Sequence, residues 1–396
     1  MTAGCTERGA FLRSPRLGAP GVGAWAADLF AAADFPDRRL SSLAQSIVAA
    51  FAARPTDSIP RTFDDWAGVK GAYRFIENER VTCETIGNSM AQAAARARAP
   101  CDSVIAVRDT TGVTFPNAAR MEGLGSLNDG PELGMMIHST LAVSHDGVAL
   151  GLLDVQWWAR DFRPRWRARK PPAGRPLGAA HVDLPRSHGR PARDGVRVEP
   201  RAKRPRLDPP ADRRRRGLEI TLVEVWEPRA PEGLEPLRWP PRTAETVESL
   251  EDSLAIIDIY KPRWRIEDYH LVLKAGRRVE ELQFETAERA AKAIYTHAAA
   301  AVRIVALRDL ARRHHPDVPC TEALSESEWR APWTRIHKEP PSRLAPPPSL
   351  RQAVPWIGRM GGHLGREGDG TPGPTTLWRG WRNLQTLVVL YEILAP

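Results

Sequence analysis

The amino-acid sequence predicts an α/β or α+β fold, with buried strands in the middle of the chain and helical segments before and after them. Three observations support this prediction. Apolar residues recur at helical spacing between residues 40 and 51, and a strand pattern begins at Ser103 and continues into a hairpin pattern. Helical spacing then returns from Glu245 to Leu307. From Ser103 onward, the order of these patterns therefore places the strands before the long helices.

The N-terminal part of the chain is predicted to be helical. Residues 1–22 mix charge, Gly and Pro, and we expect a disordered tail there. Leu40, Leu43, Ile47 and Phe51 then lie on one helical face, and Pro55 marks the end of that helix. Further short helices are expected up to residue 100. Residues 23–100 are therefore expected to form one helical domain.

Strand patterns characterise the next part of the chain. The apolar run SVIAV at residues 103–107 is followed by RDTTG, which is typical of a buried strand ending in an acid and a turn. Two apolar runs flank Asp146 and Gly147, and an Asp-Gly pair is a strong hairpin signal. LEITLVEVWE, at residues 218–227, predicts another strand. We expect residues 101–338 to form one domain with these strands in its sheet.

The positive charge of the chain is concentrated in one segment. The net charge is +9, yet residues 160–217 alone hold nineteen Lys and Arg against six Asp and Glu. This segment also holds ten prolines and few apolar residues, so we expect it to be largely disordered and to interrupt the 101–338 domain. An Arg and Pro bias can also arise from a GC-rich coding sequence. The segment is therefore weak support for a shaped nucleic-acid surface.

The C-terminal part follows a linker. The composition EPPSRLAPPP at residues 339–348 is typical of a linker, and residues 349–396 are predicted to be helical. Trp378, Trp381, Leu384 and Val388 lie on one stripe of the last helix. Such a stripe either forms part of a core or faces a partner chain.

Other features bear on the compartment and on the class of protein. The chain has no apolar run long enough to span a membrane, and its N-terminus lacks the continuous apolar segment of a signal peptide. We expect a cytoplasmic protein without membrane contact. The four cysteines are widely spaced, which is not typical of a zinc site or a disulfide framework.

One short segment combines an acid with several bases. In IYKPRWRIEDYHLVLKAG, residues 259–276, a continuous helix would place Tyr260, Arg263, Glu267 and Lys274 on one face. Taken alone, this pattern fits a solvated amphipathic helix in which Glu267 pairs with neighbouring arginines. Other parts of the chain must therefore decide its role.

Four blocks of the sequence resemble bacterial insertion-sequence transposases of the DDE type, in the Tn5-like branch. The blocks are, in chain order, GAYRFIENERV, AVRDTTGVTF, EPLRW followed by the segment quoted above, and GRMGGHLGREGDGTPGPTTLWRGW. The third block is the specific one, because its spacing of Tyr, Arg, Glu and Lys matches a signature of that branch. The resemblance implies a ribonuclease H-like catalytic domain, a helical N-terminal domain that binds the transposon ends, and a helical C-terminal region for dimerisation.

The resemblance also implies roles for individual residues. Asp109 and Glu267 match two of the three carboxylates that hold Mg²⁺ or Mn²⁺, while Tyr260, Arg263 and Lys274 match residues that hold DNA phosphates. Hard divalent ions prefer carboxylate oxygens, and the cut strand needs donors beside them, so the mixture suits this chemistry.

Two of these assignments have an ordinary structural alternative. Trp239 matches a tryptophan that stacks on a flipped base, and its alternative is a buried core residue. Asp109 follows a strand, where an aspartate is normally a turn or cap residue.

The second aspartate of the triad is missing from its expected place. It should lie between the hairpin that ends at Trp158 and the LEITLVEV strand, but the chain passes there into the Arg and Pro segment. An internal deletion that removed a strand, a helix and the aspartate explains this. Asp183 is the best remaining substitute, followed by Asp154 and Asp161. The catalytic core is therefore expected to be truncated.

Two functions follow from the resemblance. The chain is either a cut-and-paste transposase that binds inverted terminal repeats and joins them to target DNA by two-metal chemistry, or a non-catalytic DNA-binding remnant that inhibits full-length transposase through mixed dimers. Because one carboxylate is missing, we expect this copy to be catalytically impaired. In both cases we expect a homodimer on DNA in a bacterial cytoplasm. An unrelated RNA-binding protein would need aromatic stacking motifs that the sequence lacks.

Overall fold

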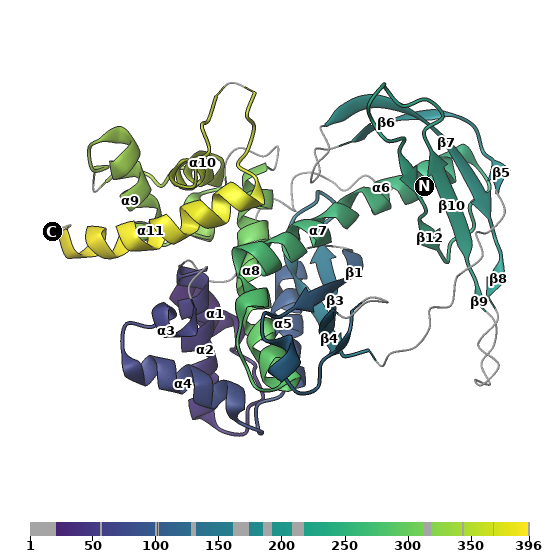
Figure 1. Ribbon diagram of the computed structural model, residues 1–396. Coiled ribbons are helices and arrows are strands. Elements are labelled where there is room, and N and C mark those ends of the chain that lie inside the picture. Colours follow the sequence, from purple (N-terminus) through teal and green to yellow (C-terminus); the bar gives the residue numbers. More distant parts are fainter. Residues whose placement is uncertain are drawn as a thin grey trace. The chain divides into compact units, whose positions relative to one another are not determined.

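A computed structural model describes residues 21–394 apart from 56–57, 100, 102, 128–131, 161–173, 185–191, 208–217, 313–317, 343 and 367. The tail predicted at residues 1–22 lies almost wholly outside the described residues. The chain divides into two units, of which the first comprises residues 1–164 and 265–396 and the second residues 165–264. The predicted mixture of helices and sheet is confirmed (Figure 1).

An antiparallel sheet lies in the first unit. β1 (Ile105–Thr114) pairs with β3 (Leu133–Val143), and β3 pairs with β4 (Ala149–Trp158) and with the short β2 (Gly125–Ser126). The predicted hairpin at Asp146 and Gly147 is confirmed, since it joins β3 to β4. Gly147 has φ of 84°, which favours glycine at this turn. Among the described strands, β1 has a neighbour on one side only.

The N-terminal helices of this unit are α1 (Val22–Leu29), α2 (Arg38–Ala53), α3 (Ile59–Thr62), α4 (Trp66–Glu77) and α5 (Cys83–Arg98). The periodicity predicted for α2 is confirmed, because Leu40, Ile47 and Phe51 are buried. Asp37 caps α2 by accepting a hydrogen bond from the backbone N–H of Arg39, and Thr82 caps α5 in the same way through Thr85. Local sequence signals therefore place these helices well.

The centre of this unit is the long helix α8 (Ala287–Arg312), which packs against β4, α2 and α5 (Figure 1). By length and composition α8 could cross a membrane, but its most apolar window is wholly buried within the structure. Its alanine-rich surface allows neighbouring elements to approach on every side. The C-terminal helices α9 (Glu326–His337), α10 (Leu350–Met360) and α11 (Pro374–Leu394) also pack in this unit.

The stripe on α11 is part of the core. Trp378, Trp381 and Leu384 are buried, and Trp381 Nε1 donates to the carbonyl oxygen of Ala52 at 2.9 Å. The far end of the same helix carries exposed apolar side chains, at Val389, Leu390, Ile393 and Leu394. The helix therefore combines a buried stripe with an uncovered apolar end.

The second unit is a sheet backed by a helix. Its strands are β5 (Arg175–Pro176), β6 (Ala180–Leu184), β7 (Arg193–Lys203), β10 (Thr221–Trp226), β11 (Arg238–Trp239) and β12 (Arg242–Thr243). A separate short ribbon joins β8 (Arg206–Leu207) to β9 (Leu218–Glu219). The helix α6 (Leu250–Tyr260) contributes Ile256 and Ile257 to the core of this unit.

The prediction that residues 160–217 are largely disordered is wrong for the strands that lie within it. Val196, Val198 and Ala202 alternate with charged residues along β7, and they pack on Val223 and Val225 of β10. Composition counts the apolar side chains on one face of a strand together with the charged side chains on its other face. The apolar face of β7 is buried by residues of β10, which lie outside the segment. A low average hydrophobicity therefore concealed a half-buried strand.

Candidate catalytic acids and nucleic-acid contacts

Asp109 lies in the middle of β1, the edge strand of the sheet in the first unit. Its Oδ1 accepts a hydrogen bond from the backbone N–H of Thr110 at 2.9 Å, and its Oδ2 lies 3.9 Å from Nδ1 of His270. The side chain is 39% exposed, so one side of the carboxylate is open to solvent. Asp109 is therefore a strand residue whose carboxylate is partly accessible to solvent, and the alternative of a turn or cap residue is wrong.

Glu267 lies on α7 (Trp264–Leu271), three residues before His270. Residues three apart are neighbours on one helix face, so Glu267 lies on the side of α7 from which His270 approaches Asp109. Burial lowers the pKa of His270 to about 4, and the Asp109 carboxylate only partly offsets this effect. The imidazole is therefore neutral near pH 7. The structure therefore places Asp109 beside His270 of α7, the helix that also carries Glu267.

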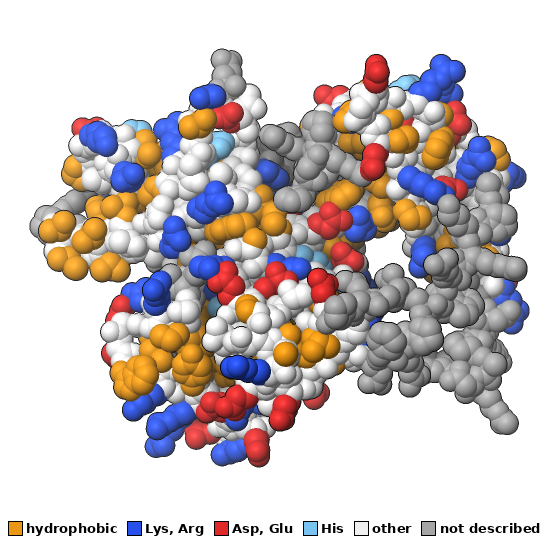
Figure 2. Space-filling model, viewed as in Figure 1, with side chains coloured by type: hydrophobic (Ala, Val, Ile, Leu, Met, Phe, Trp, Pro, Cys, Tyr) orange, Lys and Arg blue, Asp and Glu red, His pale blue; other side chains and the backbone are white. Residues whose placement is uncertain are grey.

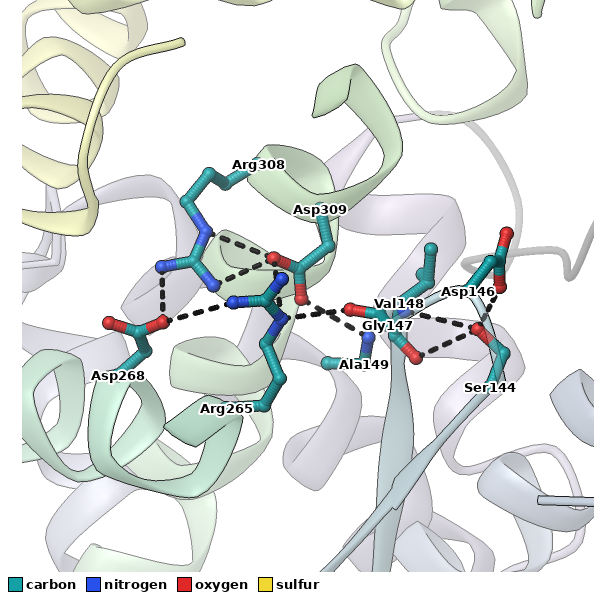
Figure 3. A network of polar contacts seen from close by, with 9 residues as sticks. All are labelled: Ser144, Asp146, Gly147, Val148, Ala149, Arg265, Asp268, Arg308 and Asp309. Carbon is teal, nitrogen blue, oxygen red and sulfur yellow. Dashed lines mark hydrogen bonds and ion pairs between the residues drawn. The ribbon is translucent and has the colours of Figure 1, made fainter. Parts of the chain in front are cut away.

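A network of buried ion pairs holds α7 against α8 and the β3–β4 hairpin (Figure 3). Arg308 on α8 donates to Asp268 and to Asp309 at 2.7 Å each. Arg265 Nε donates to the carbonyl oxygen of Gly147 at 2.9 Å, and Asp309 Oδ2 accepts from the backbone N–H of Ala149 at 3.2 Å. Because Asp268 is adjacent to Glu267, this network fixes the helix that carries the candidate catalytic acid.

The described residues contain no cluster of three His, Cys, Asp or Glu side chains that could hold a metal ion. A third acid beside Asp109 is therefore not found among them. Strand register excludes Asp154. Asp109 is paired with Ser139, which is paired with Val155, so Asp154 projects from the opposite face of the sheet. Asp161 lies outside the described residues.

Asp183 lies on β6 in the second unit. It is exposed, and its Oδ1 accepts a hydrogen bond from the backbone N–H of Gly195 at 2.8 Å. This contact crosses the β6–β7 hairpin and gives Asp183 a local structural role. Its assignment as the second catalytic acid stays a prediction.

The continuous helix that would place Tyr260, Arg263, Glu267 and Lys274 on one face is not present in this described segment of the chain. Tyr260 ends α6, a 3₁₀ turn follows at Lys261–Arg263, and α7 gives way to a π-helical turn at Val272–Gly276. Pro262 has no backbone N–H to donate, which favours a change of helix type there. A uniform rotation of 100° per residue therefore does not describe this segment.

Lys274 already has partners within the first unit. Its Nζ donates to the carbonyl oxygen of Gly112 on β1 at 2.9 Å and lies 3.0 Å from Oε1 of Glu280. Lys274 therefore contacts the strand that carries Asp109, at a position three residues further along. A DNA phosphate would have to compete with Glu280 for this ammonium group.

Tyr260, Arg263 and Trp239 form an aromatic cluster in the second unit. The Tyr260 ring lies 5.6 Å from that of Trp239, and the Arg263 guanidinium lies 5.3 Å from the Tyr260 ring and 4.9 Å from the Trp264 ring. Trp239 is only 4% exposed and belongs to the core of this unit. The structure thus shows the core alternative for Trp239, and stacking on a base would require its ring to become exposed.

The helix α4 has an exposed face that sequence reasoning named only in part. Val69, Ala72, Phe75 and Ile76 are buried, whereas Trp66, Lys70 and Arg74 follow one another on the opposite face at intervals of four residues. Trp66 is 65% exposed, and Lys70 Nζ lies 5.7 Å from the centre of its ring. In the sequence, the pattern that indicates this face is a tryptophan followed at intervals of four residues by a lysine and an arginine.

Two segments of the chain match known protein families. Residues 22–81 match the family described as Transposase DNA-binding, and residues 299–393 match the family described as Transposase Tn5 dimerisation domain. The first segment contains α1–α4, including the exposed face of α4. The second begins within α8, about forty residues before the linker that the sequence suggested, and it ends in α11.

Proposed function

We propose that this chain recognises the inverted terminal repeats of a cut-and-paste element. The proposal starts from its two matched segments, which show that the chain belongs to the Tn5-like insertion-sequence transposases. The matched segments support DNA binding and homodimerisation. Target DNA would be a second partner, and the bacterial cytoplasm would be the site of action. We propose that this copy is catalytically impaired.

The exposed face of α4 is the proposed contact with the transposon ends. Lys70 and Arg74 supply positive charge for backbone phosphates, and Trp66 supplies a flat apolar surface beside them. All three belong to the segment that matches the Transposase DNA-binding family. The buried face of the same helix holds these side chains on a rigid support.

This contact can be tested with a paired substitution. Replacing Lys70 and Arg74 with Ala should weaken binding of an end-containing duplex and lower the dependence of log affinity on log salt by about two, because each phosphate contact accounts for about one unit of slope. Arg335→Ala on α9 is the matched control, since Arg335 is also exposed but lies outside the DNA-binding segment. Equal losses in the control and the double variant would contradict the assignment.

The observation that carries the proposed impairment is the donor set around Asp109. The family chemistry uses Mg²⁺ or Mn²⁺ held by three carboxylates. Two matching residues, Asp109 and Glu267, are described, and no three His, Cys, Asp or Glu side chains gather as metal ligands among the described residues. Two-metal cleavage needs ions about 3.5–4 Å apart on preorganised ligands, and these two side chains do not fit that requirement. The position of β1 at the edge of the sheet agrees with the loss of a strand beside it.

The test is a nicking assay on duplexes that carry the element ends, with Mg²⁺ or Mn²⁺ and with the full chain. We expect binding without metal-dependent cleavage. Insertion of the missing block from a full-length relative between Arg160 and Val182 should restore cleavage, and replacing the inserted Asp with Ala should abolish it again. Strong cleavage by the unmodified chain that is lost in Asp183→Ala would make Asp183 the second acid and overturn the proposal.

A second function, inhibition of full-length transposase through mixed dimers, is favoured by the uncovered end of α11. Val389, Leu390, Ile393 and Leu394 are more than half exposed and lie in the segment that matches the dimerisation family. Exposed apolar patches of this kind are typical of protein interfaces. Replacing Leu390 and Ile393 with Glu should shift the chain to a monomer in sedimentation and abolish inhibition of a co-expressed full-length relative. Inhibition by the monomeric variant would contradict mixed dimers.

A further inference from the structure

The sheet of the second unit has one face covered by its core and a second face that is open and basic. Along β7 the side chains of Val196, Val198 and Ala202 point inward, and those of Arg197, Glu199, Arg201 and Lys203 point outward. Along β10 the outward residues are Leu222, Glu224 and Trp226. Figure 2 shows Lys and Arg side chains spread over the surface of this unit.

Cross-strand pairing arranges these side chains in rows. Trp226 is flanked by Glu199 on β7 and by Arg238 on β11, and the next row pairs Glu224 with Arg201. The row beyond it contains Lys203, Leu222 and Arg242. We call this surface, formed by Arg197, Glu199, Arg201, Lys203, Leu222, Glu224, Trp226, Arg238 and Arg242, the outer sheet face.

The outer sheet face has an excess of positive charge. Its five cations meet two carboxylates, which are engaged in the pairs Arg197–Glu199, at 3.1 Å, and Arg238–Glu224, where Arg238 Nε donates at 2.8 Å. Arg201, Lys203 and Arg242 have no carboxylate partner within the described part of the chain. Three cations on one open sheet therefore remain available for an anionic partner.

The same face contains a hollow beside an aromatic ring. Arg201, Glu224, Trp226 and Arg238 line a depression of about 270 Å³, and Trp226 is 38% exposed although it is a large apolar side chain. A ring at the edge of a hollow that two arginines also line can stack with another flat ring, while guanidinium groups contact the phosphates that flank that ring.

We propose that the outer sheet face binds an unpaired strand of DNA, with a base stacked on Trp226 and phosphates on Arg201, Lys203 and Arg242. A duplex offers phosphates but keeps its bases stacked inside, so it cannot use the ring and the hollow together. Stacking of this kind tolerates any base, and the surface therefore discriminates by strandedness. The inference rests on the proposed function only in taking DNA as the nucleic acid. It adds a second surface, in a different unit from α4.

The test uses the full chain and two labelled oligonucleotides, a single-stranded dT 15-mer and the end-containing duplex, in anisotropy titrations at several salt concentrations. Trp226→Ala should weaken single-strand binding roughly 10-fold, the effect of losing one stacked base, while Trp226→Phe should retain most of the affinity. Replacing Arg201 and Arg242 with Ala should lower the salt slope for the single strand by about 1.4, because each phosphate contact accounts for about 0.7.

Arg229→Ala is the matched control, because Arg229 is exposed in the same unit but lies in the loop between β10 and β11 and is not one of the residues of the outer sheet face. Its single-strand affinity should stay within twofold of that of the unmodified chain. Unchanged single-strand binding in Trp226→Ala, with duplex binding intact, would overturn this inference and leave the proposed function standing. Equal losses of single-strand and duplex binding would identify the face as a duplex surface and also overturn the inference. Failure of duplex binding in the unmodified chain would instead contradict the proposed function.

Discussion

Arginine has opposite surroundings in the two units of this chain. In the first unit Arg308 is 1% exposed and lies between two carboxylates, those of Asp268 and Asp309 (Figure 3). In the second unit the side chains of Arg197 and Arg238 are more than half exposed on an open sheet. The same residue type therefore holds the fold together at Arg308 and lies on an open surface at Arg197 and Arg238.

The difference has an energetic basis. A buried ion pair depends on both partners, because removing one leaves an uncompensated charge in a medium of low polarity. An exposed ion pair contributes little to stability, since water and salt screen it and two long side chains must be ordered to form it. Substitution of buried Arg308 should therefore act on stability, and substitution of the exposed arginines of the outer sheet face on binding.

The largest effect is expected at Arg308. Replacing Arg308 with Ala leaves Asp268 and Asp309 without their principal partner and should destabilise the chain by about 3–5 kcal/mol. Urea unfolding followed by circular dichroism measures this loss. The control is Arg289→Ala, which removes an exposed pair with Glu285 and should cost less than about 1 kcal/mol. A loss below about 1 kcal/mol for Arg308→Ala would remove the basis of the comparison.

A smaller effect on stability is expected at His297. This side chain contacts the buried Arg277, which has no carboxylate in contact with it among the described residues. Arg277 Nη2 donates to His297 Nδ1 at 3.2 Å, and the imidazole stacks on Phe51. Burial, and secondarily the Arg277 charge, hold the pKa of His297 well below its usual value near 6.5. The folded state therefore takes up fewer protons than the unfolded state below pH 6.5, so the stability that depends on neutral His297 is present above pH 6.5 and decreases as the pH falls.

This pH dependence can be measured by urea unfolding between pH 7.5 and 5. His297 should contribute up to about 1.4 kcal/mol per pH unit to the decrease in stability below pH 6.5, which is the value for one proton. His297→Gln should flatten that part of the profile. His337→Gln should leave it unchanged, because His337 is exposed. An unaltered profile in His297→Gln would show that the ring is not held neutral by its surroundings.

The smallest effect on stability is expected on the outer sheet face. Replacing Arg197 and Arg242 with Ala removes exposed charges and should change the free energy of unfolding by less than about 0.5 kcal/mol. The same variant should still lose affinity for a single strand, with a reduced salt slope. A clear destabilisation without a change in binding would give these residues the structural role that Arg308 has in the first unit.

Much of the fold and part of the candidate site could be predicted from local patterns. The periodicity of α2, the Asp-Gly hairpin and the strand that begins near Ser103 depend on neighbours a few residues apart, and all three are present in the structure. The predicted end of that strand at Asp109 is wrong, because β1 continues to Thr114 in register with β3. The spacing of the third block also singled out Lys274, whose Nζ contacts Gly112 on the strand that carries Asp109. Such patterns are informative because helix and strand periods are local properties of the backbone.

The sequence by itself determined where charge is concentrated and which local patterns form α2, the hairpin at Asp146 and Gly147, and the strand that contains Asp109. Only the tertiary structure decided that Trp239 is covered, that Lys274 is paired with Glu280, and that β7 forms half of a packed sheet. These outcomes depend on contacts between residues far apart in the chain. Burial and ion pairing are set by what packs against a side chain, and the arginines of this protein acquire their different roles in that way.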